Sequence, residues 1–278
     1  MAKLLRALML LLAALMLFAV LGNAEEEEGK GYKYTPYRPV FRANEKFDYS
    51  IYWNGLKVGY MNIWSGDTPA EGQPLRYYFV SKSSRLGKIL LRFFSTSGNS
   101  RTDREDGSSQ GFFRHLARDE AYLEETVNFH YDTMDLLQVI KHDRRRRAVE
   151  RFRLIEDRML DPVSLLWHMR AVKFEKVGDK REYYLFADGF FTVTMTVASR
   201  KTLELPDLGE RDVWVVETAV PRPMLSFRTG SFSLEIDVQT GIILSVSWDD
   251  TGGTCRARLT KAENSPLPFP NDAADGDR

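Results

Sequence analysis

Alternation of apolar and polar residues around short turn motifs is the feature that most constrains the fold of this chain. From Phe47 to Trp53 every second residue is apolar, and Asn54-Gly55 follows directly. A period of two is typical of a half-buried strand, and Asn-Gly suits the two left-handed positions of a type I′ turn. Because the alternation resumes at Leu56, residues 46–64 are predicted to form a β-hairpin.

The same pattern recurs further along the chain. Asp188-Gly189 lies between segments 182–187 and 191–197, and Thr240-Gly241 lies between segments 232–238 and 242–248. Turn motifs at intervals of roughly 8–12 residues, without the spacing of βαβ units, predict antiparallel pairing of about ten or more strands. The remaining strands are predicted at 75–82, 125–131, 135–141, 147–155, 212–219 and around the inward-facing Cys255, Ala257 and Leu259.

One segment is predicted to form a substantial helix. Asp161 is a suitable N-cap and Pro162 a suitable first residue, and an apolar stripe of helical period follows. Ser164 and His168 would then form the polar side of an amphipathic helix, and a shorter helical turn is predicted at 85–92. The predicted architecture is therefore mainly β, a large curved antiparallel sheet or open barrel with one packed helix. The stripe consists of Leu165, Leu166, Met169 and Val172.

The N-terminal residues have the pattern of a secretory signal peptide. Lys3 and Arg6 precede an apolar segment from Ala7 to Leu21, and Gly22-Asn23-Ala24 supplies the small residues that a signal peptidase requires. The apolar segment is shorter than the roughly 20 residues needed to cross a membrane. We therefore expect cleavage after Ala24, export and no stable membrane span, with an uncleaved anchor as the alternative.

Composition separates the chain into four predicted parts. Both ends lack hydrophobic periodicity and are rich in acidic residues, Pro or Gly, which is typical of disordered tails. The mature N-terminus would be Glu25 rather than a cysteine, which argues against lipid modification. The parts are a signal peptide at 1–24, a disordered acidic and Tyr/Pro-rich tail at 25–40, a single β-rich domain at 41–262 and a disordered C-terminal tail at 263–278.

Charge and residue spacing exclude several classes of function. With 39 Lys+Arg against 39 Asp+Glu, the chain lacks the basic excess of a nucleic-acid-binding protein. The single cysteine, Cys255, cannot form an internal disulfide or a thiolate zinc site. Asp249-Asp250 before Gly252-Gly253 fits a turn better than a calcium loop. No metal or cofactor is therefore predicted, because the histidines also lack the spacing of zinc ligands: His115, His130, His142 and His168.

Two patterns resemble catalytic motifs without their structural context. Residues 107–111 match G-x-S-x-G around Ser109, but the buried strand and the helix that must flank such a serine are missing. Asp161, Ser164 and His168 share one helical face, but helix capping accounts for the aspartate. We predict no catalytic residues and no enzymatic activity, and a serine hydrolase is the least favoured alternative.

Aromatic residues make up 12% of the chain, and the predicted sheet has more inward aromatic surface than one helix can cover. This surplus favours an apolar or lipidic ligand, and an open cavity of several hundred Å³ would support such a site. A filled core would instead favour a protein-interaction scaffold in envelope assembly. The candidate cavity residues are Trp53, Trp64, Leu166, Phe191, Trp214, Trp248 and Ala257.

One strongly basic segment lies at a predicted hairpin tip and consists of Arg144, Arg145, Arg146 and Arg147. It has two interpretations. Such a segment commonly forms a solvated turn that protects the edges of a sheet. It could also contact anionic lipid head groups or an acidic protein partner, and that binding would weaken with salt.

Three segments together resemble a bacterial exported family catalogued as domain of unknown function 3108. They are Phe41–Gly59, Leu160–Arg170 and the strand pair at 231–248, and the resemblance covers roughly residues 41–260. It implies an exported, mostly antiparallel β protein of the Gram-negative periplasm, with no established activity and no catalytic residues. We therefore expect a periplasmic protein that binds a lipidic or apolar envelope component, with the envelope scaffold as the alternative.

Overall fold

The computed structural model describes most of the predicted β-rich domain. The described residues are 40–91, 95–118, 121–142, 146–156, 158–171, 173–187, 189–219, 231–250 and 253–267. The predicted signal peptide and most of both predicted tails lie outside them, as do Arg144, Arg145, Val172 and Asp188. The beginning of the predicted C-terminal tail is described, and its Leu267 is buried in the core.

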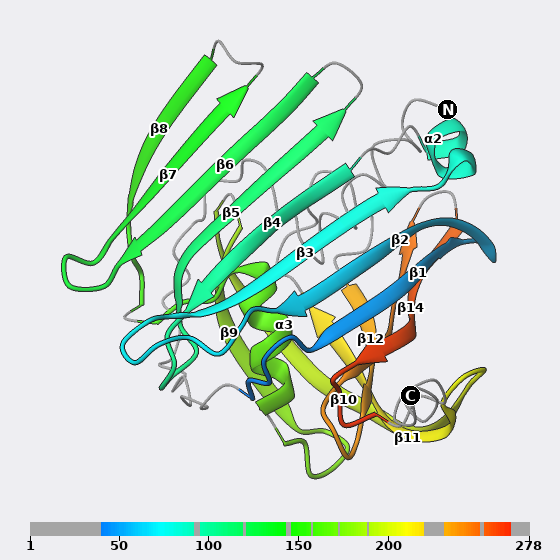
Figure 1. The fold of residues 1–278 in the computed structure, drawn as a ribbon. Coiled ribbons are helices and arrows are strands. Elements are labelled where there is room, and N and C mark those ends of the chain that lie inside the picture. Colours follow the sequence, from blue (N-terminus) through cyan, green and yellow to red (C-terminus); the bar gives the residue numbers. More distant parts are fainter. Residues whose placement is uncertain are drawn as a thin grey trace, which may run out of the picture.

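The described part of the chain forms one antiparallel sheet of 14 strands, which confirms the predicted fold class (Figure 1). Two helices accompany it, α2 (Arg85–Leu91) and α3 (Pro162–Ala171), and both lie within the predicted helical segments. The strands are β1 (Lys46–Trp53), β2 (Leu56–Ser65), β3 (Leu75–Ser83), β4 (Ser95–Thr102), β5 (Ser109–Arg118), β6 (Ala121–His130), β7 (Asp135–His142), β8 (Arg146–Arg153), β9 (Lys180–Phe186), β10 (Phe190–Leu205), β11 (Gly209–Ala219), β12 (Ser231–Asp237), β13 (Ile243–Asp250) and β14 (Gly253–Glu263).

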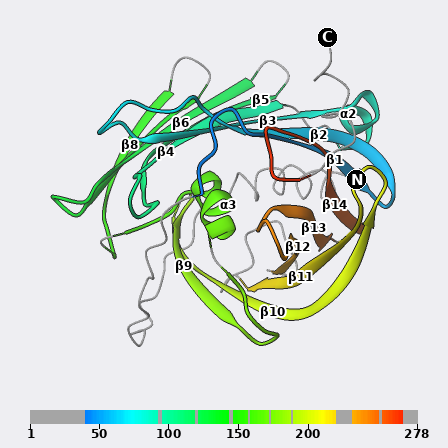
Figure 2. The same cartoon turned by 60° about the horizontal axis from the view of Figure 1, so that its bottom comes forward.

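The sheet is built from two meanders, which are joined because the first strand of the chain pairs with the last. Strands β1 to β8 pair in chain order, β9 to β14 do the same, and β1 pairs with β14. The sheet curls so that β2–β8 form one wall and β9–β13 the other, with α3 between them (Figure 2). Within the described residues β8 and β9 are the two ends of the sheet and do not pair, so the barrel is open.

The predicted hairpins are present. Trp53 pairs with Leu56 across a two-residue turn in which Asn54 and Gly55 have φ values of 45° and 81°, as a type I′ turn requires. Strands β9 and β10 form the second predicted hairpin, and β12 and β13 the third. Phe47, Tyr49 and Ile51 are all buried, which confirms the predicted inward face of β1.

Strands β4 and β5 were not predicted. Strand β4 lacks the apolar alternation because it directs small polar residues toward the interior. Thr96, Ser100 and Thr102 are buried there. Gly98 lies in the same inward row, and a Cβ at this position would lie only 2.1 Å from the backbone oxygen of Phe113 and 2.7 Å from the ring of Phe79. The missing side chain at Gly98 therefore lets an aromatic ring of β3 pack directly over β4.

Helix α3 is buried on all sides, which corrects the expectation of an amphipathic helix. Ser164 and His168, predicted to form its polar side, are only 1% and 2% exposed. Trp167 belongs to the hydrophobic cluster formed mainly with β1–β3, β5–β7, β13 and β14, whereas Met169 belongs to a second cluster formed with β9–β13. Because the sheet curls around the helix, both sides of α3 face protein.

The first prediction concerns the β1–β2 turn. Gly55→Val should destabilise the protein by about 1–2 kcal/mol, because a β-branched residue resists a φ of 81°. Gly55→Asn is the matched control, since asparagine tolerates this region. Thermal unfolding of the two variants checks the expectation, and equal melting temperatures would contradict it.

The second prediction concerns pH. Burial lowers the pKa of His168 from 6.5 to about 4. The unfolded chain therefore takes up a proton below about pH 6.5 while the native protein does not, so stability falls as the pH drops toward 4. The full effect is on the order of 3 kcal/mol.

The measurement is the free energy of unfolding in urea at pH 7 and pH 4.5. His168→Gln should lose clearly less stability between these pH values than the wild type, because glutamine does not titrate. Equal losses for the two proteins would disprove the assignment.

Candidate functional site

The interior beside α3 contains a small cavity with a volume of about 20 Å³. A cavity of this size holds about one water molecule. Its lining is apolar apart from two side chains, Tyr49 and Arg170. The residues around it are Phe47, Tyr49, Met61, Ile63, Leu166, Trp167, Arg170, Ile242, Ile243 and Val246.

Among the predicted cavity residues only Leu166 lines this space. Trp248 and Ala257 are buried in the cluster that contains Trp167, and Trp53 packs against that cluster. Trp214 is buried in the second cluster, where Phe191 packs from the side. These residues are part of the packed core among the described residues.

Trp64 lies on the other face of the sheet. Its neighbour Ile63 is buried in the interior cluster, and successive residues of a strand face opposite ways. The ring of Trp64 stacks on that of Tyr78, with centroids 5.4 Å apart. The alternation of β2 therefore places Trp64 outside the barrel, so the sequence assignment of this residue to the cavity is not supported by its position.

A buried ion pair lies at the edge of the cavity. Glu45 is fully buried, and its two carboxylate oxygens accept hydrogen bonds from the guanidinium of Arg170, of which the bond from Nη2 to Oε1 is 3.1 Å long. The guanidinium also lies over the rings of Phe47 and Trp167, at 5.3 and 4.9 Å. Sequence reasoning missed this pair, because 125 positions separate its members and no pattern of neighbouring residues links them.

A second buried ion pair lies on the inner face of β5–β7. Arg114 Nε and Glu125 Oε2 are 2.5 Å apart, and both side chains are almost fully buried. Gln138 donates from Nε2 to Glu125 Oε1 at 2.5 Å. The network links β5, β6 and β7 through their side chains. Removing one member of such a pair would leave a buried charge without compensation, which is strongly destabilising.

The structure brings together serines that the sequence had separated. Asp161 Oδ2 accepts hydrogen bonds from Ser100 Oγ at 2.5 Å and from Ser109 Oγ at 2.7 Å. Its Oδ1 accepts from the backbone N–H groups of Val163 and Ser164, which confirms the predicted N-cap. Burial raises the pKa of the Asp161 carboxyl, and these four hydrogen bonds oppose that shift.

Ser100, Ser109, Asp161 and Ser164 form what we call the Asp161 cluster. Ser109, the centre of the G-x-S-x-G pattern, uses its hydroxyl for contacts within this cluster. Its hydroxyl contacts Asp161 Oδ2, accepts from the Asp161 N–H at 2.7 Å, and lies 2.7 Å from Ser164 Oγ. A hydroxyl offers one donor and two acceptor positions. The two bonds with Asp161 use the donor and one acceptor position, Ser164 Oγ lies beside the hydroxyl, and the side chain is 0% exposed, so the arrangement is that of a structural serine.

Residues Met159–Asp161 form a strap across the open side of the sheet. Ser109 N donates to Met159 O at 2.8 Å, which ties the strap to β5. Leu160 forms a parallel bridge with Leu185 of β9, with Leu160 N donating to Tyr184 O and Phe186 N to Leu160 O, each at 2.9 Å. The strap thus connects the two walls where the strands themselves do not pair.

Aromatic rings fill the same opening. Phe152 of β8 packs against Phe186 and Phe190, with ring centroids 5.6 and 6.0 Å away. Phe129 of β6 packs on Phe186 at 6.3 Å. The two ends of the sheet therefore meet through side chains near Phe152.

The basic segment is only partly described. Arg147 lies in β8 and is exposed, Arg146 is the first residue of β8, and nothing is described of its side chain. Among the described residues there is no cluster of three or more His, Cys, Asp or Glu side chains that could hold a metal ion. None of the described helices has the length and apolar character needed to span a membrane.

The third prediction tests the role of Ser109. Ser109→Ala should destabilise the protein by about 1–3 kcal/mol, because it removes one of the four hydrogen bonds to the buried carboxylate of Asp161 and one of the two acceptors near its N–H. Ser108→Ala is the matched control, since Ser108 is also buried but lies outside the Asp161 cluster. Urea unfolding should separate the two variants, and equal stabilities would show that the cluster contributes little.

Comparison with solved structures gives similarity at the level of the fold. A β-barrel-like protein of the domain of unknown function DUF1849 from Brucella abortus is similar with a TM-score of 0.51 and 12% identity, covering 80% of this chain and 97% of that one. A protein from Bacteroides fragilis described as exported, with a YmcC-like fold, has a TM-score of 0.36 and 9% identity over 82% of this chain and 100% of its own. A protein described as a lipoprotein from Parabacteroides distasonis has a TM-score of 0.33 and 8% identity over 83% and 100%.

Comparison with curated proteins found no match. The family described as protein of unknown function (DUF3108) matches residues 48–254, which include all of β2–β13 and most of β1. This match confirms the resemblance found in the sequence. The chain therefore belongs to the DUF3108 family of proteins of unknown function.

Proposed function

We propose that this protein is a non-enzymatic, protein-interaction scaffold that is exported to the periplasm. The observation that carries the proposal is the close packing around α3, where the described residues surround a cavity of only about 20 Å³. Sites for small molecules usually have volumes of roughly 300–1,000 Å³. The interior thus serves to hold the shape of the sheet, and binding falls to its outer surface.

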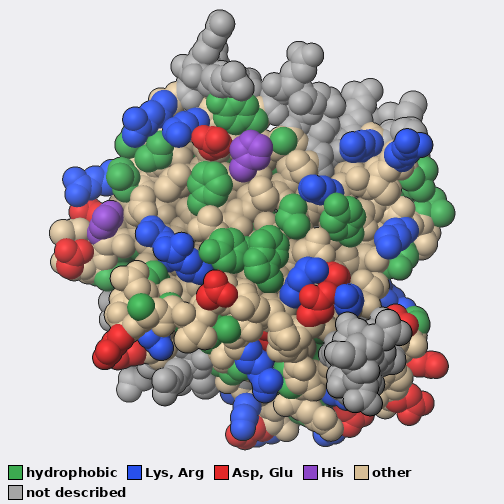
Figure 3. All heavy atoms as spheres, viewed as in Figure 1, with side chains coloured by type: hydrophobic (Ala, Val, Ile, Leu, Met, Phe, Trp, Pro, Cys, Tyr) green, Lys and Arg blue, Asp and Glu red, His purple; other side chains and the backbone are tan. Residues whose placement is uncertain are grey.

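The outer face of β2–β8 supports this assignment. One row of residues, each paired with the next across neighbouring strands, runs over the whole wall and contains three aromatic and two aliphatic side chains. Figure 3 shows hydrophobic side chains gathered in the middle of this face and cations around them. The row is Trp64, Tyr78, Asn99, Phe113, Thr126, Val139 and Val149.

Apolar side chains that gather on one outer face of a protein are typical of a protein-interaction surface. The predicted signal peptide at 1–24 supports export, and the family resemblance supports a periplasmic location. The committed hydrogen bonds of Ser109 argue against a serine nucleophile in the described part of the chain. A reaction is therefore not part of the proposal.

An apolar or lipidic ligand is the second candidate, favoured by the apolar lining of the cavity. In that case α3 would have to move, because about 20 Å³ cannot hold an acyl chain. Leu166 is the lining residue that such a movement would displace first, since it is only half-buried.

Two measurements separate the candidates. Native mass spectrometry of protein purified from the periplasm should return the mass of the mature chain alone. A stoichiometric non-protein mass that is lost in Leu166→Phe would disprove the scaffold proposal and establish the ligand.

In cells, a photo-crosslinking residue at Tyr60, on the outer face and 40% exposed, should give one defined protein adduct. The same residue at Val177, 56% exposed beyond α3, is the control and should give none.

A further inference from the structure

Strand β8 is the edge at which the sheet ends without a neighbour among the described residues. The other end, β9, is covered by Leu160 of the strap. Strand β8 pairs with β7 through all of its residues without a register shift, so its outer edge is regular (Figure 1). It also lacks proline and a bulge, two devices that keep further strands from adding to an edge.

The backbone of β8 offers hydrogen-bonding groups at this edge. Just after β8, the N–H of Leu154 donates to Met134 O at 2.9 Å, so it points toward the β7 side. Alternate residues of a strand direct their backbone groups to opposite edges. The N–H and C=O groups of the odd-numbered residues, from Arg147 to Arg153, therefore face the open edge.

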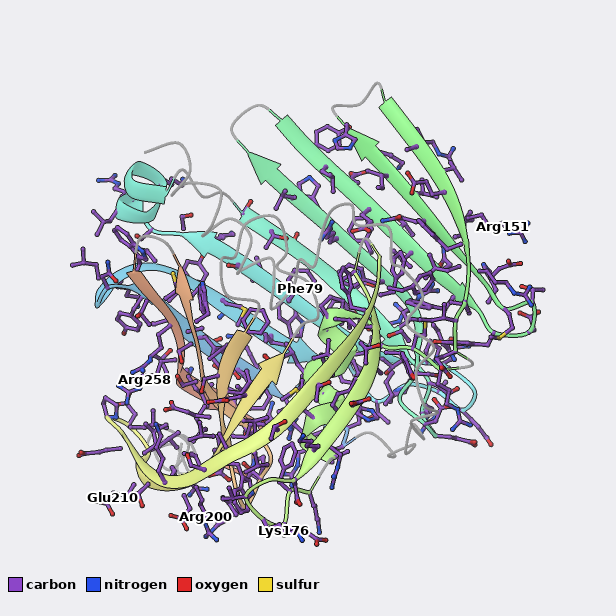
Figure 4. The ribbon with its side chains drawn as sticks, turned by 180° about the vertical axis from the view of Figure 1, so that it is seen from behind. Phe79, Arg151, Lys176, Arg200, Glu210 and Arg258 are labelled. Atoms are coloured by element: carbon purple, nitrogen blue, oxygen red, sulfur yellow. The ribbon has the colours of Figure 1, made fainter. Side chains whose placement is uncertain are left out.

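The side chains of the same odd-numbered residues lie on the outer face. Phe152 marks the inner face, because its ring packs against Phe186 and Phe190. The opposite face of β8 carries an Arg-Val-Arg-Arg row, in which Val149 is 54% exposed and the side chain of Arg151 71% exposed. In Figure 4 Arg151 lies at the outer edge of the sheet, whereas Phe79 lies inside the curve. The row is Arg147, Val149, Arg151 and Arg153.

This row carries more positive charge than its neighbours neutralise. Arg151 forms an ion pair of 2.8 Å with Asp135. Arg147 pairs across the strands with Lys141, and like charges in this position repel. The ammonium group of Lys141 is 3.4 Å from the carboxylate of Glu124, so Glu124 forms its ion pair with Lys141. A strand added beside β8 would relieve this repulsion if it carried acidic residues.

Building on the scaffold proposal, we propose that the outer edge of β8 binds an extended acidic segment of a partner protein by β-strand addition. Acidic side chains at alternate positions would lie opposite Arg147, Arg151 and Arg153, and an apolar one opposite Val149. A second copy of the chain is disfavoured as the occupant, because two antiparallel β8 strands would place arginines against arginines. A lipid surface would use the charges alone and leave the backbone groups of the edge without strand partners.

The first test uses the peptide Glu-Thr-Glu-Thr-Val-Thr-Glu, which matches the row in antiparallel orientation. It should bind the full-length exported protein, measured by calorimetry, and bind more weakly as salt rises. Replacing its three Glu by Gln should weaken binding roughly tenfold, since three cross-strand charge pairs are lost. N-methylation of its Glu and Val amides should abolish binding, because these would be the donors to β8. Equal binding of the N-methylated peptide would overturn strand addition.

Variants of the protein locate the site. Arg147→Glu, Arg151→Glu and Arg153→Glu combined should lose the acidic peptide and gain a version with Lys in place of Glu. Lys173→Glu, Lys176→Glu and Lys180→Glu combined, all exposed and distant in sequence, are the matched control and should bind normally. Val149→Pro keeps every charge but removes one edge N–H, and it should also lose the peptide. Thermal unfolding confirms that each variant is folded.

Failure of this inference can be told apart from failure of the scaffold proposal. If the peptide does not bind while the Tyr60 adduct persists, the assignment to β8 is wrong and the scaffold proposal stands. If phosphatidylglycerol vesicles bind through Arg147, Arg151 and Arg153 and the peptide does not, the segment is a membrane contact and the inference is overturned. If a ligand co-purifies and no adduct forms, the scaffold proposal itself fails.

Discussion

The fold depends on one buried carboxylate. Asp161 is the N-cap of α3 and the last residue of the strap between the two walls. Its carboxylate also accepts hydrogen bonds from the hydroxyl groups of Ser100 in β4 and Ser109 in β5. A charge or a polar acid without partners at this depth would be costly, and the four hydrogen bonds it accepts offset that cost. The same bonds fix the start of the helix relative to the wall that contains β4 and β5. The contact with the other wall comes from the neighbouring residue, Leu160, through its backbone bonds to β9.

The strap explains how a sheet with two ends can enclose a helix. Backbone bonds through Leu160 and Ser109, together with the rings of Phe152, Phe186 and Phe190, take the place of strand pairing between β8 and β9. A complete barrel would have no edge, but this arrangement covers β9 and, among the described residues, leaves the outer edge of β8 without a neighbouring strand. The two ends of the sheet therefore differ. The partner binding proposed above would use only the β8 end.

Local patterns predicted most of the fold, whereas the site depends on distant contacts. The Asn54-Gly55 turn and the alternation around Ile51 are properties of neighbouring residues, so the sequence predicted them correctly. Strand β4 escaped because its inward face carries serine and threonine, whose hydroxyl groups find partners only in the folded chain. The burial of His168 could not be predicted either, because helical period reveals which residues share a face but not that both faces meet protein. No pattern of neighbouring residues linked Glu45 with Arg170, although each lies in a segment that carries the family resemblance.

The pairing of β1 with β14 has a consequence for how the chain folds. Every other strand pair in the described sheet joins two strands that are consecutive in the chain, whereas this pair joins Lys46 to Glu263. Closing so long a loop costs more entropy than forming a hairpin and is slow. We expect two half-sheets to form first, each with an unpaired strand, and the molecule to be most vulnerable to aggregation in that interval. A chaperone that shields β1 or β14 after export would therefore affect the yield of folded protein more than its final stability.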